Sequence, residues 1–159
     1  MVLKKLGELF SITLHDVGRE NVPKHLLITL EESEKDEEIV SSGKNQNFFE
    51  KRNTTVISII ETQAKIEIPV VTIQLLSSRR KSAAHLTAAT NAISELLEEL
   101  SKAEVIHANQ IKVAVLGKWY DLPSRLVDAV KSAVDATADY DRFFLNLCVQ
   151  YNGQQEIVD

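Results

Sequence analysis

Cysteine, long apolar runs, excess positive charge and internal repeats are all scarce or missing in this sequence of 159 residues. The single cysteine, Cys148, cannot form an internal disulfide, so a disulfide-stabilised secreted scaffold is excluded and a reducing compartment is expected. No stretch reaches the ~18–20 apolar residues that a membrane-spanning helix needs. The net charge of −5, with no basic face to offset it, argues against a nucleic-acid-binding surface.

The amino-terminal segment lacks a long apolar centre and a small-residue cleavage site, so we expect no signal peptide and a cytoplasmic protein. Its apolar residues lie mostly three or four positions apart between residues 2 and 14, which is typical of an amphipathic helix. They are Val2, Leu3, Leu6, Leu9, Phe10 and Leu14. Two interpretations stay open: the helix packs on the domain, or it makes a peripheral contact with a membrane or a partner.

Length and composition indicate one globular domain over residues 1–159, with 44% hydrophobic and 26% charged residues. Four apolar segments have the composition of buried strands. They span residues 22–30, 70–76, 111–117 and 143–151.

Segments with helical spacing separate these strands. They span residues 55–65, 83–100 and 124–137. Asn53 or Thr54 is the expected cap of the first helix, and Ser82 is the expected cap of the second. The alternation of strands and helices predicts an α/β fold, with a mainly parallel central sheet and helices on both faces.

An acidic stretch follows the first strand, with six carboxylates and no glycine over residues 31–38. Phosphate sites are built from backbone N–H groups, glycines or basic side chains, so this stretch repels a phosphate. Its clustered carboxylates leave a metal site open as a hypothesis, beside the commoner interpretation of a solvated charge run.

Two strand ends are candidate sites, because ligands of open α/β sheets bind at the carboxyl ends of the strands. The last strand breaks at Asn152, in a turn. The strand at residues 70–76 is followed by Ser77 and then by Arg79 and Arg80, which could hold a phosphate or form a solvated basic turn. Ser77 lacks a His/Asp set for nucleophilic catalysis, so we expect it to act as a cap or turn residue.

The remaining polar and aromatic residues have plain structural interpretations. His25, on a strand, is expected to form structural hydrogen bonds rather than to bind a ligand. His85, expected on a helix, and His107, expected in a loop, have no second ligand nearby, so no zinc site is predicted. For Trp119 and Tyr120, an exposed aromatic contact and packing over the sheet edge stay open.

Three stretches together carry a family resemblance. They are residues 23–30, 72–78 and 145–158. They resemble the first strand, the Thr-Leu-Tyr-Ala-Phe-Ser-x-Glu-Asn-Trp segment and the Leu-Asn-x-Ala-x-x-Tyr-Gly-Gly-Arg-x-Glu-Ile-Val segment of the cis-prenyltransferases, which are the undecaprenyl and dehydrodolichyl diphosphate synthases. These enzymes extend an allylic diphosphate with isopentenyl diphosphate, so the resemblance implies their fold and a place in isoprenoid synthesis.

The sequence departs from the family pattern at the positions that the resemblance assigns to substrate and metal. Glu31 stands in place of the essential aspartate that serves Mg²⁺, and Lys35 in place of the loop arginine. The other replacements are Arg79 and Arg80 for Glu-Asn, Lys118 for an aspartate, and Gln154 for the last arginine. Lys35, Ser77, Arg79 and Arg80 remain weak candidates for binding substrate, and the family's late isopentenyl-binding segment is expected to be absent.

A preserved framework with a changed site is what a non-catalytic subunit, similar to the Nogo-B receptor, would have. The resemblance then implies a hetero-oligomer with an active family member that carries the Mg²⁺, and no metal or cofactor on this chain. Its interface is expected near the carboxyl end, at Tyr151, Asn152, Gln154 and Glu156. Self-pairing as a homodimer in the partner's absence stays open.

Two other functions also stay open. The chain could be a divergent enzyme that works alone with Glu31 as its metal carboxylate. It could also be an α/β protein that kept the fold and binds something unrelated.

Overall fold

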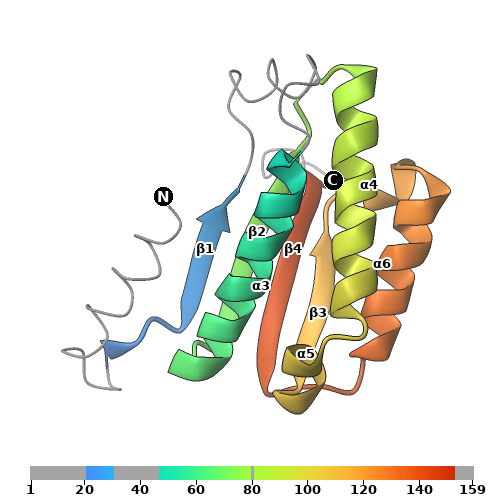
Figure 1. Ribbon diagram of the computed structural model, residues 1–159. Coiled ribbons are helices and arrows are strands. Elements are labelled where there is room, and N and C mark those ends of the chain that lie inside the picture. Colours follow the sequence, from blue (N-terminus) through green and yellow to red (C-terminus); the bar gives the residue numbers. More distant parts are fainter. Residues whose placement is uncertain (1–20, 31–46, 80, 153–159) are drawn as a thin grey trace.

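The structure, a computed structural model, describes residues 21–30, 47–79 and 81–152. Strands and helices alternate along this part of the chain (Figure 1). In order they are β1 (His25–Thr29), α3 (Phe48–Ile66), β2 (Val70–Ser77), α4 (Ala83–Leu100), α5 (Glu104–Ala108), β3 (Ile111–Leu116), the 3₁₀ helix η2 (Trp119–Asp121), α6 (Ser124–Ala136) and β4 (Phe143–Tyr151). The helix expected at residues 2–14 lies outside the described residues.

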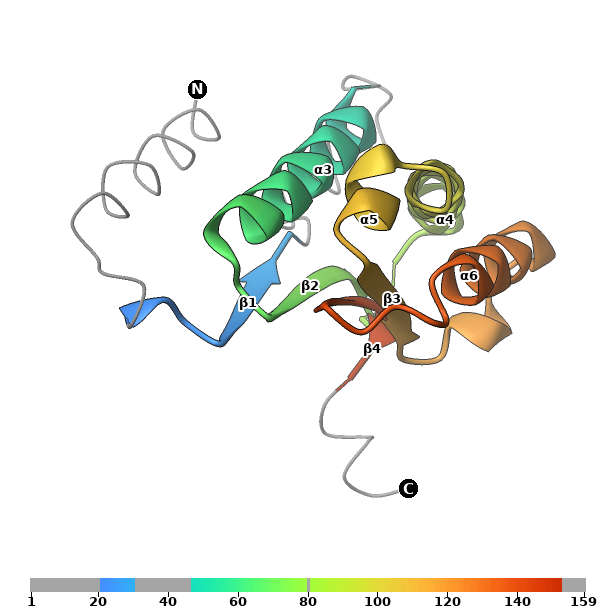
Figure 2. The ribbon, with the colours of Figure 1, turned by 90° about the horizontal axis from the view of Figure 1, so that it is seen from below.

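The strands form one parallel sheet in the order β1-β2-β4-β3. The last strand, β4, therefore lies between β2 and β3 (Figure 1). Helices α3, α4, α5 and α6 lie on one side of this sheet (Figure 2). The α/β fold with a parallel sheet is confirmed, and in the described part of the chain the helices lie against one face.

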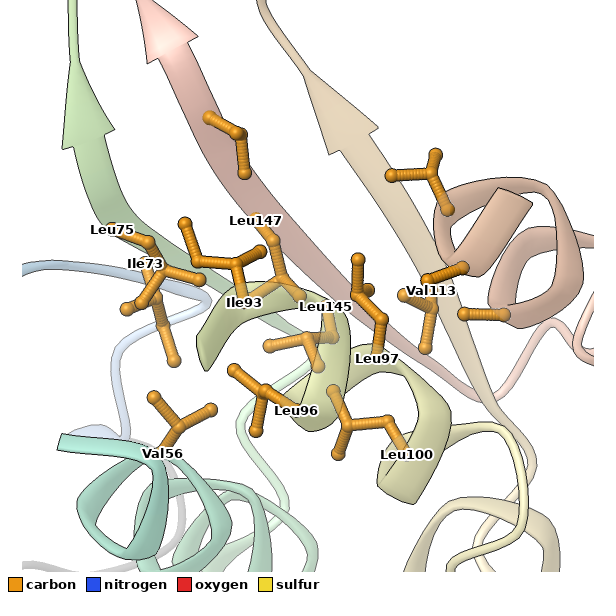
Figure 3. Packing of buried hydrophobic residues seen from close by; sticks show 14 of the residues in the cluster. Val56, Ile73, Leu75, Ile93, Leu96, Leu97, Leu100, Val113, Leu145 and Leu147 are labelled. Carbon is orange, nitrogen blue, oxygen red and sulfur yellow. The ribbon is translucent and has the colours of Figure 1, made fainter. Parts of the chain in front are cut away.

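The core lies between that face and the helices. Strand residues that point toward α4, such as Ile73 and Leu145, meet Ile93, Leu96 and Leu97 of the helix (Figure 3). All five have an exposed fraction of zero. Burying one such side chain stabilises the folded state by about 1.5–3 kcal/mol, so this layer dominates the stability of the domain.

The two expected helix caps have different outcomes. Ser82 precedes α4 and its Oγ accepts a hydrogen bond from the backbone N–H of His85 (3.2 Å), so this cap is confirmed. The prediction for α3 is wrong, because the helix begins at Phe48 and contains Asn53 and Thr54. Asn53 Nδ2 donates to the carbonyl of Ala92 on α4 (2.8 Å), so its amide NH₂ group is used between two helices rather than at a helix start.

Two short helices, α5 and η2, were not expected. The prediction that His107 lies in a loop is wrong, because His107 is on α5. Its Nδ1 lies 2.8 Å from the Tyr140 hydroxyl and its Nε2 lies 2.8 Å from the carbonyl of Ser101. Both ring nitrogens therefore have protein partners, which link α5 to Ser101 and to Tyr140. None of the helices in the described ranges combines the length and apolar character needed to cross a bilayer.

The outer edge of β3 is closed by a side chain. The backbone N–H of Val113 donates to Thr137 Oγ1 (3.0 Å), and that hydroxyl donates to the carbonyl of Ala133 on α6 (3.0 Å). Thr137 is fully buried, so one hydroxyl links the end of α6 to a strand edge that has no strand partner on that side in the described chain.

We predict that Thr137→Val lowers the free energy of unfolding by about 1–3 kcal/mol, because it leaves the buried Val113 N–H without an acceptor while keeping the side chain's shape. The control is Thr87→Val on α4, whose exposed hydroxyl donates only to the carbonyl of Ala83. Urea denaturation measures both. A loss at Thr137 no larger than the loss at Thr87 would contradict this role.

Candidate functional site

The carboxyl ends of the parallel strands meet at the upper edge of the sheet in Figure 1. Ser77 ends β2 and is paired with Tyr151, which ends β4. Asn152 follows Tyr151 directly, and Arg79 lies two positions after Ser77. The structure therefore brings Ser77 and Tyr151 together at one edge. The other candidate residues, Glu31, Lys35, Arg80, Gln154 and Glu156, lie outside the described residues.

Ser77 lies where the pairing of β2 with β4 becomes irregular. The register shifts between Gln74 and Leu76 and again between Leu76 and Ser77. The Ser77 hydroxyl is buried and has no hydrogen-bond partner among the described residues. Of the two expected roles, cap or turn, the cap is wrong, because Ser82 caps the following helix and Ser77 ends β2. Ser77 instead contributes a buried hydroxyl at the strand end.

Arg52 is a functional candidate that the sequence did not indicate. It lies on α3, has an exposed fraction of 5%, and its Nη1 donates to the carbonyl of Leu75 near the end of β2 (3.2 Å). Its guanidinium lies 4.8 Å from the ring centre of Phe49, which lies 5.8 Å from the ring centre of His85 on α4. A cation is thus held inside the domain, beside the carboxyl end of β2 and the start of α4.

A signal for Arg52 was present in the sequence. Phe49, Arg52, Val56 and Ile60 are spaced by three or four, which places them on one face of a helix. The predicted helix at residues 55–65 starts after Arg52, so this spacing was not used. With the helix beginning at Phe48, the same four side chains point inward and are all buried.

The backbones of β3 and β4 approach each other closely at their carboxyl ends. Gly117 follows β3 with a φ of +104°, and an added Cβ would lie 2.3 Å from the carbonyl oxygen of Val149. Gln150 on β4 has a φ of 52°, and its carbonyl accepts a hydrogen bond from the Lys118 N–H (3.4 Å). Left-handed backbone at a non-glycine residue costs about 1–3 kcal/mol, so this strand end is held in shape by the residues around it.

The space between the sheet and the helices α3 and α4 is closed. A side chain that lines a channel is exposed to that channel. Val56 and Ile60 of α3, Ile93 and Leu97 of α4, and Leu147 of β4 all have an exposed fraction of zero. The described side chains therefore pack against one another here (Figure 3) and do not line a channel for a long apolar ligand.

The face of the sheet away from the helices carries a polar network. His25 Nε2 lies 2.8 Å from Thr72 Oγ1, and Asn146 Nδ2 donates to the same oxygen (3.2 Å). The contact to Thr72 agrees with the expected structural role of His25. The network spans three strands, β1, β2 and β4, across the middle of the sheet.

The residues described at the carboxyl edge do not fit a magnesium site. Mg²⁺ prefers carboxylate and water oxygens. The polar residues that follow the strand ends here include the cations Arg79 and Lys118. Among the described residues, no group of three or more His, Cys, Asp or Glu side chains is placed to hold a metal ion.

Trp119 and Tyr120, the two aromatic residues after β3, differ in their surroundings. Trp119 packs against the buried core, whereas Tyr120 is 59% exposed. Their ring centres lie 6.0 Å apart in an edge-to-face arrangement. One aromatic side chain therefore supports the fold and the other is free to meet a partner.

Comparison with known proteins identifies relatives of one kind. A family model described as "putative undecaprenyl diphosphate synthase" matches residues 40–159. A tritrans,polycis-undecaprenyl-diphosphate synthase (geranylgeranyl-diphosphate specific) from Methanocaldococcus jannaschii is 26% identical over 146 residues, 90% of this chain and 51% of that protein. An isoprenyl transferase from Prochlorococcus marinus is 27% identical over 89% of this chain and 52% of its own length.

Solved structures agree on the fold. The lavandulyl diphosphate synthase of Lavandula x intermedia has a TM-score of 0.71 at 22% identity, over 86% of this chain and 58% of that one. A probable undecaprenyl diphosphate synthase from Campylobacter jejuni has a TM-score of 0.62 at 13% identity, over 87% of this chain and 59% of that one. The chain thus spans about half the length of the sequence relatives named above.

We predict that Gly117→Ala lowers the free energy of unfolding by about 2 kcal/mol or more, because the new Cβ meets a backbone carbonyl that cannot move without breaking β4. Gln150→Gly, at the same close approach, is the control. Glycine adopts the left-handed backbone without strain, which stabilises the folded state, but it also increases the conformational entropy of the unfolded chain. The two effects oppose each other, so the free energy of unfolding should change by no more than about 1 kcal/mol. Thermal unfolding of both variants checks this, and equal effects would contradict it.

Proposed function

We propose a function from one premise: this chain belongs to the cis-prenyltransferase family of undecaprenyl diphosphate synthases. The proposal is that it is a non-catalytic subunit, which pairs with a catalytic family member that makes a long-chain polyprenyl diphosphate. The catalytic partner holds the Mg²⁺ and the substrates. This chain contributes a folded surface to the complex.

The closed interior is the observation that carries the proposal. A polyprenyl product is a long apolar chain, and an enzyme that makes it has to house that chain while its diphosphate stays at the catalytic site. From the carboxyl edge of this sheet, an enclosed route would run between the sheet and α3 and α4. That space is lined by side chains with no exposure, including Val56, Ile93 and Leu147.

The charges at the strand ends also support the proposal. Arg79 and Lys118 stand where, by resemblance, catalytic relatives have acidic or amide residues. Arg52 places a further positive charge in the interior beside the end of β2. A cation in place of a carboxylate removes a metal ligand and repels the metal that would bind there.

The alternative of an enzyme active alone is favoured by the names of the relatives, which are synthases and transferases. It places the metal carboxylate at Glu31 and the growing chain on some surface other than the closed interior. An assay of the isolated chain separates the two functions directly.

We predict that the isolated chain makes no polyprenyl product from farnesyl or geranylgeranyl diphosphate, isopentenyl diphosphate and Mg²⁺. Adding a catalytic family member from the same genome should yield a complex whose activity exceeds that of the member alone. Radiolabelled isopentenyl diphosphate measures product in both cases. Turnover by this chain alone would contradict the proposal, and so would the absence of any complex.

Within the complex, Glu31→Ala should leave activity within about twofold of wild type, because the partner supplies the metal carboxylate. The matched control changes the corresponding aspartate of the catalytic member to alanine, which should reduce activity by about 10²-fold or more. If Glu31→Ala reduced activity as strongly as the control, Glu31 would be a metal ligand and the chain an enzyme.

A further inference from the structure

The exposed large hydrophobic residues of the described chain lie on strands of the sheet or just after one. They are Leu27 (64%), Tyr120 (59%), Leu116 (41%) and Phe144 (38%). Leu27, Phe144 and Leu116 are on β1, β4 and β3, and Tyr120 follows β3. Helices α3 to α6 have no exposed residue of this kind in the described ranges. The apolar surface is therefore a property of the sheet.

The strand register places Leu27, Phe144 and Leu116 on the face away from the helices. We call this the open face, and define it by three rows of paired residues. The rows are His25, Val70, Phe144 and Lys112; Leu27, Thr72, Asn146 and Ala114; and Thr29, Gln74, Cys148 and Leu116. Their neighbours along each strand, such as Val71 and Leu145, point into the core instead.

A partner can cover the open face at a small cost in desolvation. Thr72 accepts from Asn146 and lies within hydrogen-bond distance of His25, so the polar groups in its centre already have partners. Burying polar groups that are hydrogen-bonded costs little, whereas burying unpaired ones costs several kcal/mol. The face has no carboxylate, and Lys112 is its one amine. A partner that covers it needs an apolar surface with a carboxylate opposite Lys112.

Parallel sheets almost always have both faces covered, and an exposed apolar patch marks an interaction site. Four strands about 4.8 Å apart and six residues long give a face of roughly 400 Å². A specific interface needs about 800 Å² from each partner. Thr72 and Cys148 in these rows are already buried, so the open face supplies at most about half of this area. The docked surface would have to continue beyond these rows, past Tyr151 at the end of β4.

We propose that the open face, extended past Tyr151 at the end of β4, is the surface that docks the catalytic subunit. This rests on the proposed function, and it places the interface on the sheet rather than on the carboxyl-terminal turn alone. The occupant is a segment of the catalytic subunit that covers Leu27, Phe144 and Leu116 with apolar residues and pairs a carboxylate with Lys112. A second copy that paired through the same face is a poorer fit, because its own open face offers no carboxylate.

Charge substitutions on the open face test the proposal. Leu27→Asp and Leu116→Asp should each weaken binding of the catalytic subunit at least about tenfold, because each buries an unpaired carboxylate under the partner. Both residues are exposed, so both variants should fold, and circular dichroism checks this. The matched control is Ser132→Asp, which adds the same charge at an exposed position on α6. It should change the Kd by less than about twofold.

A labelling experiment tests where the occupant lies. Cys148 is 3% exposed and should react slowly with a maleimide, so Leu27→Cys adds one fast-reacting thiol. Binding of the catalytic subunit should slow its labelling at least about tenfold, as expected for a side chain that becomes buried. Labelling of Ser132→Cys on α6 should not change.

The outcomes separate the docking surface from the proposed function. If the wild-type chain binds and activates the catalytic subunit but the Asp variants bind equally well, the docking surface is wrong and the function stands. If the wild-type chain binds no catalytic family member, both fail. Slow labelling of Leu27→Cys in the isolated chain overturns the proposal. If the isolated chain is a dimer that Leu27→Asp dissociates, a second copy covers the open face. If the isolated chain is a monomer, another segment of the same chain covers it. Protection by farnesyl diphosphate would assign the face to a prenyl chain.

Discussion

The dry contact between α4 and the centre of the sheet is the constraint on which the rest of the structure depends. Ile93, Leu96 and Leu97 of α4 meet side chains of β2 and β4 with no exposure to water. This contact fixes which face of each strand points inward, and period-two alternation then decides the composition of the other face. The closed interior and the open face are therefore two results of one packing arrangement.

Much of the fold could be predicted from local chemistry, and the exceptions have physical reasons. Ser82 caps α4 because its hydroxyl oxygen accepts a hydrogen bond from a backbone N–H of the first turn, and the predicted cap is confirmed. Asn53 has the same polarity, but its amide reaches Ala92 on another helix, and no local pattern reveals a partner 39 positions away. The strand order could not be predicted either, because it depends on how whole elements pack and not on the residues of any one strand.

The candidate site could be predicted only in part. The carboxyl edge and the meeting of Ser77 with Tyr151 follow from the parallel arrangement of strands. Arg52 was missed because the predicted start of α3 lay after it, and because a buried arginine is rare. The open face was missed as well. Alternation in β1 separates two faces but does not reveal whether a helix covers both of them.

The position of β4 between β2 and β3 has a consequence for how the chain folds during synthesis. Until the residues of β4 have left the ribosome, β2 and β3 have no strand between them, and each presents unpaired backbone groups on that side. The sheet therefore closes late, through contacts between residues far apart in sequence, which slows folding. A nascent chain halted before Phe143 would keep two unpaired strand edges, which favour aggregation.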